Sequence, residues 1–244
     1  MGKPVFLVTG GSRGIGEAIA RDAASAGYRV LLTYAGRAEA AERVVRSIDA
    51  AGGEAAAIQA NTGNPDDIAR MFAAADENGR LGAFVYNGGI TGGTGLLADQ
   101  DDETLAQVMA VNLTGALISC REAVKRMSTR LGGSGGSIVL LSSRASQLGA
   151  PAQHVWYAAS KGGIDSLTIG LSKELAGEGI RVNGVSPGPI ATEIHAPGRL
   201  EAIKEMLPMK RAGTPAEVSS AVMYLISESA SYISGTTLLV AGAR

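Results

Sequence analysis

The stretch Val5-Phe6-Leu7-Val8-Thr9-Gly10-Gly11-Ser12-Arg13-Gly14-Ile15-Gly16 decides the fold of this chain. Its first four residues are apolar and partly β-branched, so they predict a short buried strand. A glycine-rich turn follows, and the residues after the turn have the composition of a helix. In a strand–turn–helix unit of this kind, backbone N–H groups and the positive end of the helix can hold the pyrophosphate of a dinucleotide.

The glycine loop alone leaves a second interpretation open. Three residues separate Gly10 from Gly14, which is looser than the usual G-x-G-x-x-G spacing. An ordinary glycine-rich turn has the same appearance in a single sequence. The choice between the two depends on what accompanies the loop.

Strand-like and helical segments alternate along the chain, which predicts an α/β fold of the Rossmann type, a doubly wound, seven-stranded parallel sheet flanked by helices on both faces. The expected strands are Val5–Val8, Arg29–Thr33, Glu54–Gln59, Ala83–Tyr86, Ser137–Ser142, Arg181–Val185 and Thr237–Val240. The expected helices are Gly14–Ala26, Ala38–Ala51, Pro65–Glu77, Glu103–Met127, Val155–Ala176 and Pro215–Ile226. No repeat or linker interrupts the pattern, so residues 1–244 are expected to form a single dinucleotide-binding and catalytic domain.

Composition narrows the function classes. The 244 residues include 34 glycines, 45% are hydrophobic, and the formal net charge is -1. Lysine and arginine form no long run, which argues against nucleic-acid and membrane-surface binding. No signal peptide precedes Val5 and no apolar run approaches membrane-spanning length, so a soluble cytoplasmic protein is expected. The single cysteine, Cys120, lies in an apolar helical stretch and predicts a buried thiol.

Tyr157 and Lys161 are the clearest chemical feature. They are four residues apart within an expected helix, so their side chains lie on one face. An ammonium beside a phenol favours the phenolate, and we therefore expect the pKa of Tyr157 to be lowered towards neutrality. A tyrosine of this kind can exchange a proton with an alcohol or carbonyl oxygen.

Several motifs occur together in one order. They are Thr9-Gly10-x-x-x-Gly14-Ile15-Gly16, Asn87-Gly88-Gly89, Asn112, Ser143, Tyr157-x-x-x-Lys161 and Pro187-Gly188-Pro189-Ile190-Ala191-Thr192. With this combination the chain resembles the short-chain dehydrogenase/reductases from Val5 to Gly242. The resemblance favours a dinucleotide loop over an ordinary turn.

The resemblance implies a set of catalytic roles. Tyr157 would be the general acid/base, and Lys161 would lower its pKa and bind the nicotinamide ribose. Ser143 would hold the substrate oxygen, while Asn112 would kink its helix and support a water-mediated proton path to the lysine. Ser142 and Ser146 remain alternatives to Ser143, because the spacing to the tyrosine does not decide between them.

The second expected strand decides the choice of cofactor. NAD-binding proteins usually place an acid at its end, whereas this strand is followed by Tyr34-Ala35-Gly36-Arg37. Arg13 and Arg37 together suit a 2′-phosphate, so NADP(H) is predicted in preference to NAD(H). The alternative is that Arg37 merely begins an exposed helix. The residues expected to bind the cofactor are Gly10, Ser12, Arg13, Gly14, Ile15, Gly16, Tyr34, Arg37, Asn61, Thr62, Asn87, Gly88, Gly89, Tyr157, Lys161, Pro187, Gly188, Ile190 and Thr192.

Two positions depart from the family pattern. Tyr86 stands where the family has a compact asparagine, and Asn61-Thr62 replaces an Asp-Val pair beside the adenine. Both changes are expected to affect cofactor binding rather than proton chemistry. No Cys, His and acid spacing indicates a metal site.

The sequence therefore predicts hydride transfer between a nicotinamide and a small-molecule secondary alcohol or ketone, of the carbonyl reductase or 3-oxoacyl reductase type. Sugar dehydrogenases resemble the chain equally well, and the fold does not choose among them. A non-redox lyase like the halohydrin dehalogenases, or an NADP(H)-binding protein without turnover, are the alternatives. The resemblance also implies a homotetramer and a substrate lid at about residues 189–213.

Overall fold

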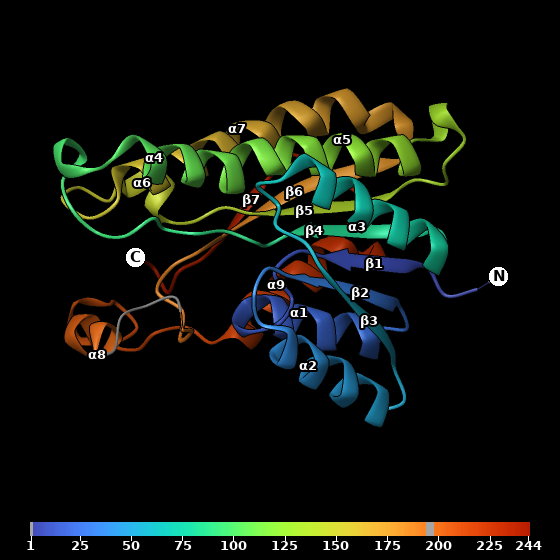
Figure 1. Ribbon diagram of the computed structural model, residues 1–244, viewed down its shortest axis with the longest axis horizontal. Coiled ribbons are helices and arrows are strands. Elements are labelled where there is room, and N and C mark those ends of the chain that lie inside the picture. Colours follow the sequence, from blue (N-terminus) through green and yellow to red (C-terminus); the bar gives the residue numbers. More distant parts are fainter. Residues whose placement is uncertain (1, 194–197) are drawn as a thin grey trace.

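A parallel β-sheet forms the centre of the computed structural model, which describes residues 2–193 and 198–244 (Figure 1). The strands are β1 Val5–Val8, β2 Arg29–Tyr34, β3 Glu54–Gln59, β4 Leu81–Tyr86, β5 Gly136–Leu141, β6 Ile180–Pro187 and β7 Thr237–Val240. Their order across the sheet is β3-β2-β1-β4-β5-β6-β7, and each neighbouring pair is parallel. The predicted strands and the doubly wound α/β class are confirmed, with small differences at the ends.

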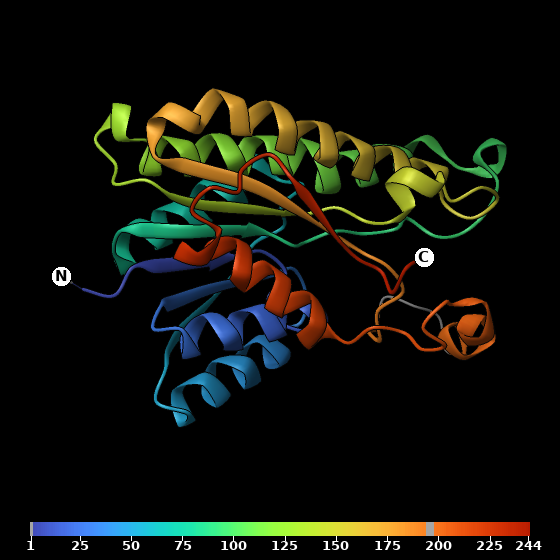
Figure 2. The same ribbon diagram turned by 180° about the vertical axis from the view of Figure 1, so that it is seen from behind.

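Helices cover both faces of the sheet, as Figures 1 and 2 show from opposite sides. One layer contains α1, α2 and α9, and the other contains α3, α5 and α7. The α-helices are α1 Gly14–Ser25, α2 Ala38–Ala50, α3 Pro65–Asn78, α4 Asp102–Met109, α5 Gly115–Met127, α6 Ala145–Leu148, α7 Val155–Leu175, α8 Arg199–Ile203 and α9 Pro215–Ile226. Short 3₁₀ turns lie at Leu97–Asp99, Thr129–Leu131, Ala176–Glu178, Lys204–Met206 and Glu228–Ala230.

The alternation of side chains in β1 builds two separate cores. Val5 and Leu7 belong to the cluster shared with α3, α5 and α7, whereas Phe6 and Val8 belong to the cluster shared with α1, α2 and α9. All four side chains are fully buried. A strand buried on both faces reads as a continuous apolar run, which is why this short stretch was recognisable in the sequence.

The topology fixes where a ligand can bind. The chain passes from β1 to β2 and β3 on one side of the sheet, and then returns to β4 on the other side of β1. The loops after β1 and β4 consequently separate at the carboxyl edge of the sheet. In open α/β sheets this divergence creates the binding crevice.

The helix predicted over Glu103–Met127 is present as α4 and α5, and its regular turn changes at Asn112, where the resemblance implied a kink. A π-helical segment, Ala110–Thr114, joins α4 to α5. The hydroxyl of Tyr86 donates a hydrogen bond to the carbonyl of Val111 inside this segment. A Cβ on Gly115 would lie only 2.1 Å from the carbonyl oxygen of Thr62, so the helix passes unusually close to the loop after β3. The π segment directly precedes this contact, and single π turns of this kind are frequent at functional sites.

The segment after β6 leaves the sheet and carries the short helix α8 (Figure 1). Its two ends meet, because Ile190 pairs with Gly213 in a parallel bridge. Residues 194–197 of the predicted lid lie outside the described residues. None of the helices in the described part of the chain has both the length and the apolar character needed to cross a membrane.

Candidate active site

A cavity of about 1020 Å³ opens at the carboxyl edge of the sheet. It is lined by the loops after β1, β2, β3, β4, β5 and β6 and by the start of α7. Every residue that the sequence predicted to bind the cofactor lines this cavity, and so does Ser143. The structure therefore brings together residues from almost the whole length of the chain.

The glycine loop has the backbone that its sequence requires. Gly10 and Gly14 adopt left-handed conformations, with φ of 64° and 54°. A Cβ on Gly16 would lie 2.2 Å from the carbonyl oxygen of Gly10, so only glycine fits at this close approach. Arg13 is the N-cap of α1, and its side chain makes no capping hydrogen bond. The first N–H groups of α1 consequently face the cavity as donors for an anion.

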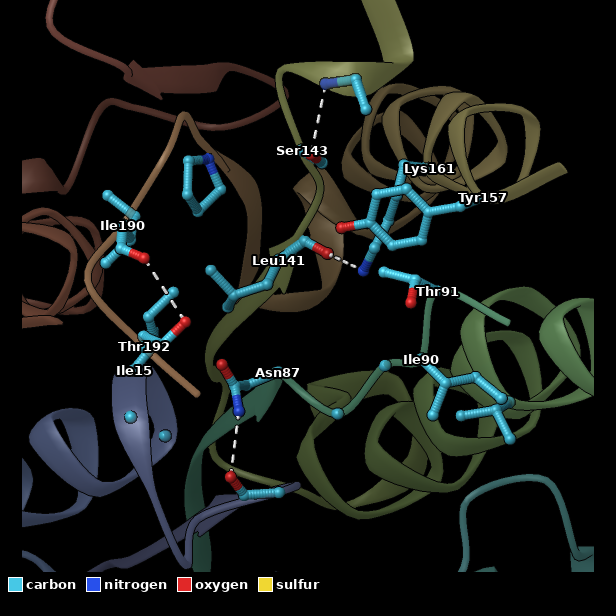
Figure 3. A pocket seen from close by; sticks show the side chains of 18 of the residues that line it. Ile15, Asn87, Ile90, Thr91, Leu141, Ser143, Tyr157, Lys161, Ile190 and Thr192 are labelled. Carbon is cyan, nitrogen blue, oxygen red and sulfur yellow. Dashed lines mark hydrogen bonds between the residues drawn. The ribbon is translucent and has the colours of Figure 1, made fainter. Parts of the chain in front are cut away.

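The loop after β4 is held against the glycine loop. The backbone N–H groups of Asn87 and Gly88 both donate to Thr9 Oγ1 at 2.9 Å. The side-chain amide of Asn87 donates to the carbonyls of Thr9 and Gly10, at 3.0 and 3.1 Å. Figure 3 shows this amide at the base of the pocket. Thr33 Oγ1 also accepts from the Gly10 N–H at 3.2 Å.

Arg13, Tyr34 and Arg37 lie at the end of the cavity beside β2. Both arginines are paired with Glu193, which the sequence analysis did not single out. Asn61 and Thr62 line the same end. The carboxylate of Asp67 accepts the backbone N–H of Asn61, while the Asn61 side chain accepts the N–H of Gly63, so this amide is already used to shape its own turn.

Ser143, Tyr157 and Lys161 converge at the other end of the cavity, around the end of β5 (Figure 3). The Lys161 ammonium lies 5.8 Å from the centroid of the Tyr157 ring. It donates a hydrogen bond of 2.7 Å to the carbonyl of Leu141, the last residue of β5. Placement at i and i+4 on α7 brings the phenol and the ammonium to one face, as the sequence predicted.

The neighbouring serines have other partners. Ser142 is buried, and its hydroxyl donates to the carbonyl of Lys161 at 3.2 Å. The Ser146 hydroxyl donates to the carbonyl of Ser143 at 2.8 Å. Ser143 interacts through its hydroxyl with the phenol of Tyr157. Of these three serines, the geometry favours Ser143 as the one that meets a substrate oxygen together with the tyrosine.

The protonation of the tyrosine and lysine differs from the expectation. Burial raises the pKa of the Tyr157 phenol, and the hydrogen bond with Ser143 only partly opposes this. Burial lowers the pKa of Lys161 to about 8, against the opposing charge of Asp165. Desolvation disfavours both charged forms, and it outweighs the attraction that the sequence analysis assumed. The lowering of the Tyr157 pKa towards neutrality that the sequence predicted is therefore not found.

Asn112 lies behind the cavity wall, fully buried in the π segment. Its side-chain oxygen accepts the N–H of Ile90 at 2.9 Å, and its amide donates to the carbonyl of Ile90 at 2.9 Å and to Ser160 Oγ at 3.0 Å. Trp156 Nε1 donates to the carbonyl of Thr91 at 2.7 Å. These two side chains fix the loop after β4 beneath Tyr157 and Lys161. For Trp156 the sequence left two interpretations open, a wall of the substrate site and a packed side chain, and the structure shows a buried side chain.

Further residues that line the cavity were not among the predicted site residues. They are Ile90, Thr91, Thr94, Gln107, Leu148, Pro151, Ile203 and Arg244. Arg144, Gln153 and His154 also line it, and for these three the sequence had left a contact with the substrate open beside a purely structural role. They combine apolar and polar surface, and no spacing in the sequence marks them as a set. Among residues 2–193 and 198–244, no group of His, Cys, Asp and Glu side chains is arranged to hold a metal ion.

Fold and cavity together define a Rossmann-type dinucleotide-binding protein, and comparisons with known proteins agree. The family model described as enoyl-(acyl carrier protein) reductase matches residues 10–242. The chain is 46% identical to oxidoreductase YgfF of Escherichia coli, over 98% of this chain and 99% of that protein. It is 39% identical to the 3-oxoacyl-[acyl-carrier-protein] reductase of Synechocystis sp., over 98% and 95% of the two chains.

The solved structures give the same result. A short-chain dehydrogenase from Burkholderia cenocepacia, crystallised in complex with NADP, superposes with a TM-score of 0.91 and 32% identity. The match covers 99% of this chain and 97% of the other. The chain thus belongs to the short-chain dehydrogenase/reductase family. It is an oxidoreductase of the class that acts on CH–OH groups with a nicotinamide cofactor.

Proposed function

We propose that this protein is an NADP(H)-dependent oxidoreductase that transfers hydride between the nicotinamide and a secondary alcohol or ketone, as a carbonyl reductase or 3-oxoacyl reductase does. One observation carries the proposal: the glycine loop and the group Ser143, Tyr157 and Lys161 line the two ends of one cavity. Similarity to a 3-oxoacyl-[acyl-carrier-protein] reductase and to a dehydrogenase crystallised with NADP supports it.

The residues fit a dinucleotide phosphate. The uncapped N-terminus of α1 and the glycine loop would hold the pyrophosphate. Arg13 and Arg37 would hold the 2′-phosphate through charge-assisted hydrogen bonds, which Lys or neutral donors make less well. A Cβ on Gly89 would lie 3.4 Å from Lys161 Nζ, so glycine at this position leaves room for the ribose that the lysine is expected to bind.

Side chains of the protein would supply the proton that the substrate oxygen receives. When bound, the cofactor supplies or accepts the hydride. The Ser143 hydroxyl would hold the substrate oxygen, and the Tyr157 hydroxyl would donate its proton to that oxygen as the carbonyl is reduced. Because burial raises the pKa of Tyr157, the phenol is protonated before the reaction and is suited to reduction. Lys161 would hold the nicotinamide ribose and stabilise the phenolate left behind.

The proposal also covers the extent of the domain, the lid and the role of Asn112. Residues 1–244 would form one catalytic domain, and the segment 189–213 would close over the substrate. Ile203 supports the lid role, because it lines the cavity although it belongs to α8. Asn112 would act by holding the loop after β4 and by supporting the proton path to the lysine.

A cytoplasmic homotetramer is also proposed. Leu117 on α5 and Ile169 on α7 are each 48% exposed, and Leu238 and Leu239 of β7 are exposed as well. Large apolar side chains exposed on α5, α7 and β7 would be covered by contact with further copies. Light scattering at micromolar concentration should give four times the 24.7 kDa of one chain, and a monomeric mass would contradict the assembly.

The affinity for NADPH should depend on the charge of Lys161. Its pKa of about 8 means that the ammonium is present below that pH and is lost above it. Calorimetric titration should therefore show NADPH binding weakening several-fold between about pH 7 and about pH 9. Tyr157 does not contribute in this range, because its pKa is raised.

The matched variant for this test is Lys161→Met, which has no charge to lose. It should bind NADPH more weakly than the wild type at neutral pH, and its affinity should be flat over the same range. An NADPH affinity of the wild type that does not change with pH would exclude the proposed contact of the ammonium with the cofactor.

The proposed function is tested by NADPH and NADH oxidation against a panel of ketones, diketones, 3-oxoacyl thioesters and keto-sugars. Turnover of at least one carbonyl class with NADPH, and a lower kcat/KM with NADH, is expected. A clear preference for NADH would contradict the choice of cofactor. Tight NADPH binding without turnover across the panel would favour a binding protein instead.

A further inference from the structure

A carboxylate at the start of the lid occupies the two arginines that are expected to select the cofactor. Oε2 of Glu193 accepts hydrogen bonds from Nη1 of Arg37 at 2.6 Å and from Nη1 of Arg13 at 3.3 Å. The Arg37 guanidinium, with a smaller contribution from Arg13, holds the pKa of the Glu193 carboxyl below its usual range. One charged oxygen atom thus binds both guanidinium groups.

The three side chains come from separate parts of the chain. Arg13 precedes α1, Arg37 precedes α2, and Glu193 lies after β6. The residue before it, Thr192, lies over the glycine loop, because a Cβ on Gly14 would be 3.2 Å from Thr192 Cγ2. All of them line the cavity. The ion pair therefore connects the start of the lid to the end of the cavity beside β2.

Resting on the proposed NADP(H) function, we propose that Glu193 is a specificity-determining residue, whose carboxylate competes with the 2′-phosphate of NADP(H) for Arg13 and Arg37. A phosphate monoester accepts hydrogen bonds from the same donors as a carboxylate, namely the N–H groups of a guanidinium. Two anions on one pair of arginines repel each other, so the phosphate binds after the carboxylate has left.

Only molecules whose arginines are free of Glu193 can bind the 2′-phosphate. The apparent affinity is therefore the intrinsic affinity multiplied by the fraction of such molecules. All three side chains are exposed, between 45% and 64%, and ion pairs at this exposure are weak. The carboxylate is consequently displaceable, and its removal should tighten phosphate binding by roughly three- to tenfold.

Selectivity follows from the same contact. NAD(H) has no 2′-phosphate, so its adenosine can bind while Glu193 stays on the arginines. The carboxylate thus penalises NADP(H) and not NAD(H). Neutralising Glu193 should increase the preference for NADP(H) over NAD(H). This effect should require that Arg13 or Arg37 is still present.

Isothermal titration calorimetry with 2′-AMP and 5′-AMP measures the affinity for a 2′-phosphate without any need for turnover. The proteins are the wild type, Glu193→Gln, Arg37→Ala and the double variant, all at one low salt concentration, because exposed pairs are screened. Glu201→Gln is the matched control, since Glu201 is another exposed lid carboxylate and pairs with Lys204 instead. Glu193→Gln should bind 2′-AMP roughly three- to tenfold more tightly than the wild type, with 5′-AMP changed less than about twofold.

Two further results are expected. Glu201→Gln should behave like the wild type, and Glu193→Gln should lose most of its effect when Arg37 is already Ala, since the two side chains share one interaction. A 2′-AMP affinity that is unchanged or weaker in Glu193→Gln, or that rises equally for 5′-AMP or in Glu201→Gln, overturns the role of Glu193.

The binding of 2′-AMP and 5′-AMP to the wild type distinguishes a failure of the role of Glu193 from a failure of the NADP(H) assignment. If it binds 2′-AMP more tightly than 5′-AMP and loses that preference in Arg37→Ala, the NADP(H) assignment stands whatever Glu193 does. If neither the wild type nor Glu193→Gln binds 2′-AMP better than 5′-AMP, both the NADP(H) preference and the competition by Glu193 are excluded. A preference for 2′-AMP that appears only in Glu193→Gln supports the competition and contradicts the NADP(H) preference of the wild type.

Discussion

Replacing Tyr157 with Phe is expected to lower kcat for ketone reduction by roughly 1,000-fold, within the range that a positioned general acid contributes. The phenyl ring keeps the packing of α7 against the cavity but has no hydroxyl to donate. NADPH affinity should change by less than about threefold, because the phosphate-binding residues are untouched. Single-turnover reduction and NADPH titration measure the two quantities separately.

Tyr232→Phe is the matched control, since the Tyr232 side chain is fully exposed and does not line the cavity. It should keep the kcat of the wild type. Retention of more than about a tenth of the activity by Tyr157→Phe would show that another group donates the proton. A loss of activity accompanied by an equal loss of NADPH binding would point to structural damage instead.

The variant in which Arg13 and Arg37 are both Ala is expected to lower kcat/KM for NADPH by roughly 100-fold and to leave kcat/KM for NADH within about threefold. Each guanidinium would make charge-assisted hydrogen bonds to the 2′-phosphate, and both are exposed, so screening reduces the effect of each. Initial rates over a range of each cofactor, at one saturating substrate concentration, measure the change.

Arg46→Ala is the control for this pair, because Arg46 is an exposed arginine on α2 that pairs with Glu42 outside the cavity. It should change neither constant. Equal losses for NADPH and NADH in the double variant would mean that the arginines hold a feature common to both cofactors, and the prediction of NADP(H) from the end of β2 would then be wrong.

The local pattern of the chain was enough to predict its fold. The buried apolar strands, the glycines and the helix start at Pro65 are each determined by nearby residues, and the structure has the corresponding elements in the predicted places. The site residues found by motif also line one cavity, because parallel strands bring their carboxyl ends to the same edge.

What could not be predicted depends on contacts between distant segments. The resemblance implied a kink at Asn112, but the approach of Gly115 to Thr62 and the hydrogen bond of Tyr86 at the π segment are not visible in the helical stretch itself. The tyrosine that departs from the family pattern is thus accommodated as a support for the helix that carries Asn112. The pairing of Glu193 with two arginines far away in the sequence has no local signal at all.

The raised pKa of Tyr157 also depends on distant segments of the chain, which surround the side chain in the fold. Helical spacing correctly placed the lysine beside the tyrosine, but it carries no information on how deeply the pair is buried. Lys161 is 3% exposed and Tyr157 is partly buried, and desolvation lowers the pKa of the lysine and raises the pKa of the phenol. Proximity was predictable from the sequence, whereas desolvation required the surrounding structure.

Hydride is expected to pass directly between NADP(H) and a carbonyl carbon in this cavity. The most direct test uses NADPH deuterated at the transferring position of the nicotinamide ring, with mass spectrometry of the alcohol formed from the best ketone of the panel. Each alcohol molecule should carry one deuterium from the cofactor, and Tyr157→Phe should form the same labelled product far more slowly. An alcohol without deuterium, from cofactor deuterated on either face of the ring, would contradict the account.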